Sequence, residues 1–96
     1  MIRLDDTITV NEDLMVADLD GEMVLLNTQS GTYFGLNEVG SRIWELASEP
    51  RMITDILDAL ANEYSVDQKQ LEGDVLHFIN SLFQRSLVHV VATVEV

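Results

Sequence analysis

The hydrophobic pattern of the chain changes at Asn37, and this change limits the possible folds more than any other feature. Before Asn37, short runs of strand-forming residues alternate with turn residues. After it, apolar residues recur at the three- and four-residue spacing of helices. Strands followed by helices are typical of the α+β class.

The first half of the chain predicts a three-stranded antiparallel meander. Asp20-Gly21 separates two strand-like runs, residues 14–19 and Glu22–Asn27. This dipeptide suits a type I′ hairpin turn, in which both central residues have a positive φ. A second turn cluster, residues 28–31, precedes the third strand, Thr32–Leu36, and we expect one edge of that strand to be unpaired. Thr7–Val10 is a further strand-like stretch.

The second half predicts three helices. Asn37 is a good N-cap for the first helix, and Pro50 ends it. The second helix begins at residue 53 or 54, and Asp67 caps a last helix that extends to about Arg85. The apolar stripes of the three helices consist of Val39, Ile43, Leu46 and Ala47, then Ile53, Ile56, Leu57, Leu60, Ala61 and Tyr64, and finally Leu71, Val75, Phe78, Ile79 and Leu82.

These elements predict one winged-helix-like α+β domain over residues 1–96, a three-stranded meander followed by three helices. A chain of 96 residues leaves no room for two independent cores, and a hydrophobic content of 47% is sufficient for one. After the last helix, Ser86 stands where glycine is usual. Residues 87–94 again have strand-like composition, as expected of a wing or a trailing arm.

Charge and composition restrict the partners. The chain carries 17 acidic and five basic residues, a net charge of -12, so we expect it to bind neither nucleic acid nor an anionic membrane surface. It has no cysteine, no signal-peptide pattern at its start and no apolar run of about 20 residues that could span a bilayer. We therefore expect a cytoplasmic protein.

Motifs for catalysis, metals or cofactors are weak. Asp74 and His77 share a helix face, but no third metal ligand accompanies them. Residues 18–22 resemble the start of a calcium loop that lacks its later ligands, so a hairpin turn is favoured. The sequence thus predicts a protein that is no enzyme and has no catalytic residue, no metal and no cofactor. A DNA-binding winged helix is an alternative, but Glu72 and Asp74 interrupt the basic and amide residues of its last helix.

The strongest candidate for function is a surface formed by the third strand and the last helix. Tyr33, Phe34 and Leu36 make the strand more apolar than an edge that faces only water should be. Asp74 and Phe78 flank the apolar stripe of the helix. An open strand edge beside a helix-lined groove is the geometry for adding an extended peptide to a sheet.

Residues 33–46, Tyr-Phe-Gly-Leu-Asn-Glu-Val-Gly-Ser-Arg-Ile-Trp-Glu-Leu, resemble the signature stretch of the PqqD-like family, the leader-peptide recognition proteins of ribosomally made, modified peptides. The order and spacing of later residues also match, including Tyr64, the run Leu71-Glu72-Gly73-Asp74-Val75 and Phe78. The resemblance covers about residues 14–90 and is strongest to the stand-alone members that serve lasso-peptide biosynthesis.

This resemblance implies a non-catalytic module that binds the leader region of a precursor peptide by strand addition and delivers it to a protease and a cyclase, or to another modifying enzyme. A PqqD-type chaperone that presents a precursor to a radical enzyme, for PQQ or another modified peptide, is the alternative within the family. Mapped onto this chain, the implied peptide-binding residues are Thr32, Tyr33, Phe34, Gly35 and Leu36 on the strand, and Leu71, Asp74, Val75 and Phe78 on the helix. The chain departs from the family pattern at Ser86, where glycine is usual, and at Ala47, where leucine is common.

Overall fold

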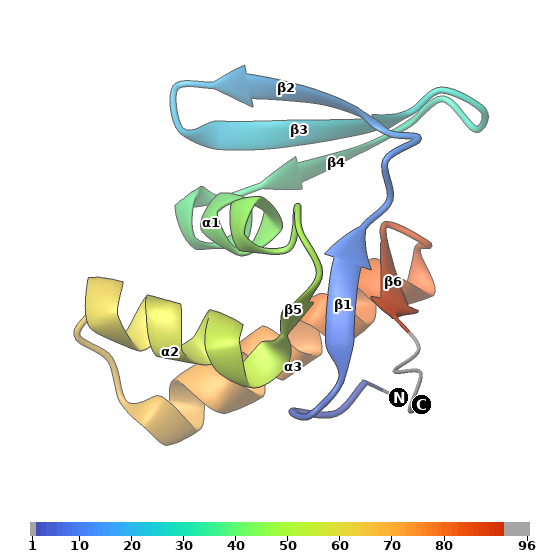
Figure 1. The fold of residues 1–96 in the computed structure, drawn as a ribbon. Coiled ribbons are helices and arrows are strands. Elements are labelled where there is room, and N and C mark those ends of the chain that lie inside the picture. The colour runs from blue at the N-terminus through green and yellow to red at the C-terminus, as the bar shows by residue number, and fades with distance from the viewer. Residues whose placement is uncertain (1, 92–96) are drawn as a thin grey trace.

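The computed structural model of the protein describes residues 2–91. Figure 1 shows how its strands and helices are arranged. In chain order they are β1 (Thr7–Val10), β2 (Met15–Leu19), β3 (Glu22–Asn27), β4 (Thr32–Leu36), α1 (Glu38–Leu46), β5 (Arg51–Met52), α2 (Ile53–Glu63), α3 (Gln68–Gln84) and β6 (Val88–Val91).

Strands β2, β3 and β4 form an antiparallel sheet in that order. The turn between β2 and β3 has a positive φ at both Asp20 (56°) and Gly21 (88°), which matches the right-handed twist of the flanking strands. The Asp18 carboxylate accepts a hydrogen bond from the Gly21 amide at 3.0 Å. The predicted meander is therefore confirmed, including its first turn.

A second antiparallel sheet has the order β5-β1-β6. Ile8 of β1 lies between Arg51 of β5 and Val90 of β6. The strand-like stretch Thr7–Val10 is thus a strand, and the stretch predicted after the last helix contains β6. Residues 92–94 of that stretch lie outside the described part of the chain. The two-residue strand β5 is an addition that the sequence pattern does not predict.

The helix boundaries follow local signals. Asn37 caps α1 by accepting a hydrogen bond from the Gly40 amide at 2.8 Å, and Asp67 caps α3 by accepting one from the Lys69 amide at 2.9 Å. After α3, Ser86 has a φ of 61°, the left-handed conformation usually supplied by glycine at this place. Serine therefore keeps the ordinary geometry at the entry to β6.

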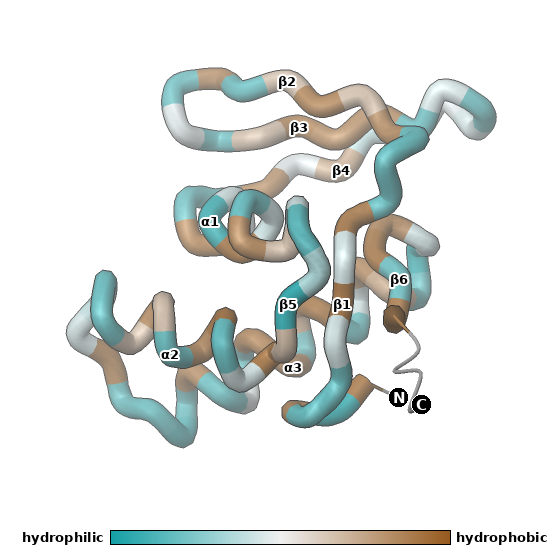
Figure 2. Tube along the Cα trace, viewed as in Figure 1, coloured by the Kyte–Doolittle hydropathy of each residue, from teal (hydrophilic) through white to brown (hydrophobic). Residues whose placement is uncertain are grey.

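The core lies where the two sheets and the three helices meet. Figure 2 shows the apolar residues along the chain in brown, although those of β2 are exposed. In Figure 1 the meander lies at the top, α1 is directly beneath it, and α2 and α3 are below. The largest side chains with almost no exposure are Ile8, Leu25, Ile53, Ile56, Leu60, Val75, Ile79, Leu82 and Val88. The predicted α+β class, with a meander followed by three helices, is confirmed.

One buried polar side chain, Ser41 of α1, fixes the meander to the helices. Its hydroxyl accepts a hydrogen bond from the Met23 amide at 2.9 Å and donates one to the Leu36 carbonyl at 3.3 Å. Met23, near the start of β3, pairs with Leu36 at the end of β4, so this hydroxyl binds both strands at the same end of the sheet. The carboxyl end of β4 is thereby placed against the start of α1.

Candidate functional site

Strand β4 is an edge strand. It pairs with β3 on one side, and within residues 2–91 no strand pairs with its other side. Side chains alternate along it: Leu36 is buried and Phe34 half-buried on the inner face, whereas Tyr33 is 74% exposed on the outer face. A Cβ at Gly35 would meet no atom within 4 Å. The unpaired edge that the sequence predicts is therefore confirmed, and its backbone is open to approach.

A groove of about 350 Å³, the α1–α3 groove, begins where β4 ends. Its lining consists of Asn37, Val39, Gly40, Ile43, Val66, Leu71, Asp74, Val75 and Phe78. The structure thus brings together all four predicted helix residues. Val75 is buried, Leu71 and Phe78 are half-buried, and Asp74 is exposed. An apolar groove with one carboxylate at its rim suits the side chains of a peptide.

The wall of this groove that α1 provides is not predicted from the sequence. Val39 and Ile43 belong to the apolar stripe of α1, and that pattern cannot separate core positions from groove positions. The signal that could have found this wall is Gly40, a glycine within an amphipathic helix. A Cβ at Gly40 would lie 2.9 Å from Cζ of Phe78, so the ring of Phe78 packs directly on this glycine.

A smaller hollow of about 140 Å³, the Arg85 hollow, lies at the opposite end of β4. Its lining consists of Leu25, Asn27, Thr32, Tyr33, Phe34, Arg85 and Leu87. The guanidinium carbon of Arg85 lies 5.0 Å from the centre of the Phe34 ring, a cation–π contact. The predicted strand residues Thr32, Tyr33 and Phe34 therefore lie beside this hollow, and the edge of β4 extends from it to the α1–α3 groove.

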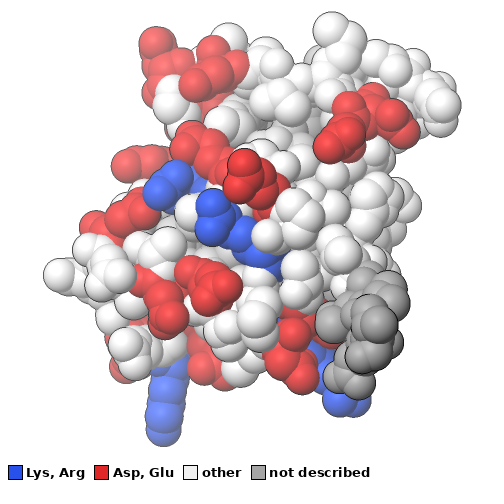
Figure 3. All heavy atoms as spheres, viewed as in Figure 1, with Lys and Arg blue, Asp and Glu red and all other residues white. Residues whose placement is uncertain are grey.

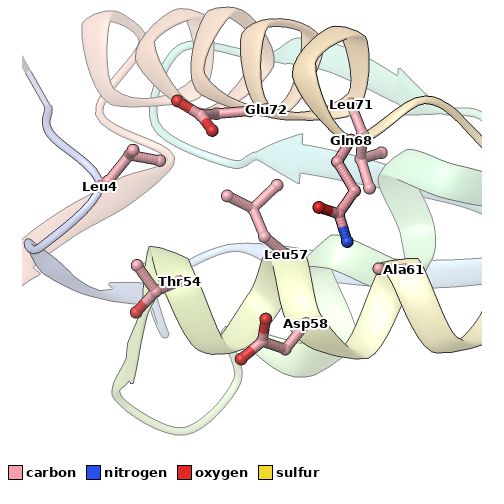
Figure 4. A pocket seen from close by; sticks show the side chains of 8 residues that line it. All are labelled: Leu4, Thr54, Leu57, Asp58, Ala61, Gln68, Leu71 and Glu72. Carbon is pink, nitrogen blue, oxygen red and sulfur yellow. The ribbon is translucent and has the colours of Figure 1, made fainter.

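A third hollow of about 170 Å³ lies between α2 and α3, away from the free strand edge. Leu57 of α2 points toward α3, and Gln68 of α3 points toward α2 (Figure 4). Leu71 lines both this hollow and the α1–α3 groove. None of the residues that line this hollow belongs to a strand.

Charged side chains are mostly acidic, and on the face shown in Figure 3 several separate acidic groups surround a few basic residues near the middle. Arg42 of α1 is held by Glu63 of α2, with 2.9 Å between the guanidinium Nη2 and the carboxylate Oε2. This hydrogen-bonded pair lowers the pKa of the Glu63 carboxyl and raises that of Arg42. The pair joins α1 to α2, and neither residue lines the α1–α3 groove.

Among residues 2–91 no three His, Asp or Glu side chains are grouped so that they could hold a metal ion. His77 lines a different hollow of α3, with Asn80, Phe83 and Gln84, whereas Asp74 lines the α1–α3 groove. In the same part of the chain, no helix is long and apolar enough to cross a membrane.

Two solved structures of proteins bound to leader peptides are similar to this chain in sequence and fold. The structure of TbiB1 in complex with the TbiA(beta) leader peptide is 41% identical to this chain, with a TM-score of 0.78, and the match covers 88% of this chain and 99% of TbiB1. A lasso peptide synthetase B1 complexed with the leader peptide is 27% identical, with a TM-score of 0.75, and the match covers 85% of this chain and 96% of that one. A comparison with curated proteins gave no match.

The family described as coenzyme PQQ synthesis protein D (PqqD) matches residues 22–88. This segment includes β4 and α3, which carry the predicted site residues. The match extends over more than half of the chain, and the chain therefore belongs to the PqqD family, as its sequence resemblance predicts.

Proposed function

We propose that this protein binds the leader segment of a ribosomally synthesised precursor peptide and serves a lasso-peptide pathway. The leader adds as a strand to the free edge of β4 and packs against α3. The protein then delivers the precursor to a protease and a cyclase. It acts as a single, non-catalytic domain in the cytoplasm, where the precursor is made.

One observation carries this proposal. The unpaired edge of β4 extends from the Arg85 hollow to the apolar α1–α3 groove, in a fold that TbiB1 shares and in which TbiB1 is complexed with a leader peptide. Main-chain groups of β4 supply affinity by pairing, and alternate side chains of the peptide enter the groove. Leu71, Val75 and Phe78 provide the apolar contacts, and Asp74 provides a charge at the rim.

The alternatives have less support. The family match by itself also suits a PqqD-type chaperone that presents a precursor to a radical enzyme. The 27% identity to a lasso peptide synthetase B1 complexed with the leader peptide supports the lasso pathway instead. A DNA-binding regulator would need cations on α3, but the chain has a net charge of -12.

The direct test is binding of the TbiA(beta) leader peptide, labelled with a fluorophore and measured by anisotropy. We expect saturable binding with a Kd of about 10 µM or below, and no binding of a scrambled peptide. In amide NMR spectra, the largest shifts on titration should fall on residues 32–36 and on the α1–α3 groove. If the leader binds no better than the scrambled peptide, the proposed function is wrong for this ligand class.

Two phenylalanines of α3 provide a matched pair of variants. Phe78 lines the α1–α3 groove, whereas Phe83 is 40% exposed and lines the hollow of His77. Phe78→Ala should weaken leader binding by about thirtyfold, and Phe83→Ala should leave it unchanged. Both variants need a parallel urea titration, because a ring packed on the core also supports the fold. Equal loss of affinity in the two variants would place the peptide elsewhere.

A further inference from the structure

The two ends of the β4 edge carry opposite charges. Arg85 lies at the end where the strand begins, beside Thr32 and Phe34. Asp74 lies in the α1–α3 groove, which opens at Asn37, directly after the strand ends. An extended peptide along β4 therefore meets a cation near one of its ends and a carboxylate near the other.

Arg85 is positioned to accept an acidic group. Its guanidinium stacks on the Phe34 ring at 5.0 Å, which restricts the side chain and leaves the N–H donors at the edge of its plane. Within residues 2–91 both salt bridges belong to Arg42, and Arg85 takes part in neither. A carboxylate of the peptide that enters the Arg85 hollow would therefore gain a partner without breaking one of these pairs.

Asp74 is positioned to accept a basic side chain. It lines the α1–α3 groove and also a neighbouring hollow of about 240 Å³, together with Val66, Asp67, Gln70 and Leu71. Leu71 and the half-exposed Val66 provide an apolar surface beside the two carboxylates. Lysine and arginine combine an apolar stem with a cationic head, so they fit this combination better than a shorter polar residue does.

The direction of the added strand sets the order of the two charges in the peptide. The sheet is antiparallel throughout, and purely antiparallel sheets are favoured over mixed ones, so the peptide should run antiparallel to β4. Since β4 begins at the Arg85 end, the peptide begins at the Asp74 end. We propose that this edge selects extended peptides in which a basic residue precedes an acidic one, with Asp74 and Arg85 as the residues that determine this order.

This inference rests on the proposed function and specifies its ligand. Arg85 lies beside the start of β4, and Asp74 lies in the groove that opens after the strand ends, so the two peptide positions should be about four to six residues apart, roughly the length of the strand. The pairs are exposed to solvent, so each contributes a modest preference that salt should screen.

The test is a charge scan of the TbiA(beta) leader peptide, in which each position in turn is replaced by Lys and by Glu. Competition against the labelled parent peptide should reveal one position that prefers Lys and a later one that prefers Glu, each by about threefold to tenfold at low salt. Arg85→Glu should make the Glu-preferring position of the peptide prefer Lys, and it should leave the preference at the other position unchanged. Asp74→Asn should abolish the Lys preference alone.

Control variants with the same change in net charge at other positions distinguish these local effects from a general effect of the protein's charge. Arg51→Glu on β5 changes the charge by the same amount as Arg85→Glu, and Asp58→Asn on α2 matches Asp74→Asn. Neither control should alter the scan. Arg85→Lys should keep the Glu preference, which a purely structural role of Arg85 in stacking on Phe34 would not do.

The possible results distinguish the inference from the proposed function. If the parent peptide does not bind, the proposed function fails. If it binds and the scan shows no preference that depends on Arg85 or Asp74, the inference is wrong while leader binding stands. If the Glu-preferring position precedes the Lys-preferring one, the peptide runs parallel to β4, and the proposed order is wrong.

Discussion

The ring of Phe78 packs on the backbone of Gly40, so closely that a Cβ at Gly40 would lie 2.9 Å from ring atom Cζ and 3.4 Å from Cε1. The contact joins α3 to the first turn of α1, directly after the end of β4. Real Cβ atoms essentially never approach another heavy atom to 2.9 Å. Glycine at this position therefore determines where the ring lies, and with it the width of the α1–α3 groove.

Gly40→Ala should lower the affinity for the leader peptide more than it changes the stability of the fold. Alanine gains about 1 kcal/mol of helix propensity, and the tip of the Phe78 ring can swing away from the added methyl group. Phe78 lines the α1–α3 groove, so a ring that moves away from Gly40 changes the shape of that groove. Leader affinity should therefore fall by about fivefold or more, while stability to urea changes by less than about 1 kcal/mol. Unchanged affinity would mean that the ring position does not shape the groove.

Two variants make this interpretation specific. Gly73→Ala adds a methyl group to α3 where a Cβ meets no atom within 4 Å, so it should stabilise the protein by about 1 kcal/mol and leave binding unaltered. Phe78→Leu removes the tip of the ring, and the Gly40→Ala substitution should then have little further effect on affinity. Independent, additive effects of the two substitutions would contradict direct contact.

Ser86→Gly should stabilise the protein. Ser86 has a φ of 61°, which costs a residue with a Cβ about 1 kcal/mol relative to glycine. Its carbonyl, which accepts a hydrogen bond from Asn11 Nδ2, is retained in the variant. Urea unfolding should show a gain of about 0.5–1 kcal/mol. Ser81→Gly, inside α3, should show a loss of similar size because its backbone is helical.

The Arg42–Glu63 pair should contribute to stability in a pH-dependent way. The pKa of the Glu63 carboxyl is lowered from its ordinary value of 4.5, chiefly by its hydrogen bonds to Arg42. The folded state therefore releases this proton more readily than the unfolded state, so the contribution is fully present above pH 4.5 and is lost as the pH falls through the lowered pKa. Urea titrations should show Glu63→Gln to be less stable than the parent at neutral pH and equal to it in strong acid.

The same substitution in an Arg42→Gln background supplies the control for this pH effect. Without the guanidinium, the carboxylate at position 63 has lost the group that lowers its pKa. The pH-dependent difference should therefore disappear in this background. If it persists, another group is responsible for it.

Much of the fold follows from local signals in the sequence. The φ values of Asp20 and Gly21, and the caps formed by Asn37 and Asp67, are properties of one turn of chain, and each is predicted. The second sheet is different. Ile8 finds its partners at Arg51 and Val90, and nothing in the local pattern of a four-residue strand specifies a pairing so distant in sequence.

The candidate site, too, is predicted only in part: its α3 residues follow from the sequence, but its α1 wall does not. Leu71, Val75 and Phe78 are predicted because a helical stripe and a family motif both mark them, and the structure places them in one groove with Asp74. The wall that α1 provides is not predicted, because Val39 and Ile43 have the spacing of core residues. The contact of Arg85 with the ring of Phe34 is not predictable from local patterns, because the two residues lie some fifty positions apart in the chain.

The central claim is that recognition occurs by backbone pairing at β4, and single N-methylation along the TbiA(beta) leader peptide tests it most directly. Each methyl group on a pairing amide should remove about one hydrogen bond, some 0.5–1.5 kcal/mol, and add a steric clash, whereas methyl groups on the intervening amides should have little effect. Strand addition therefore predicts losses of affinity that alternate with a period of two along the bound segment. A flat profile, or losses spaced every three to four residues as in a bound helix, would contradict it.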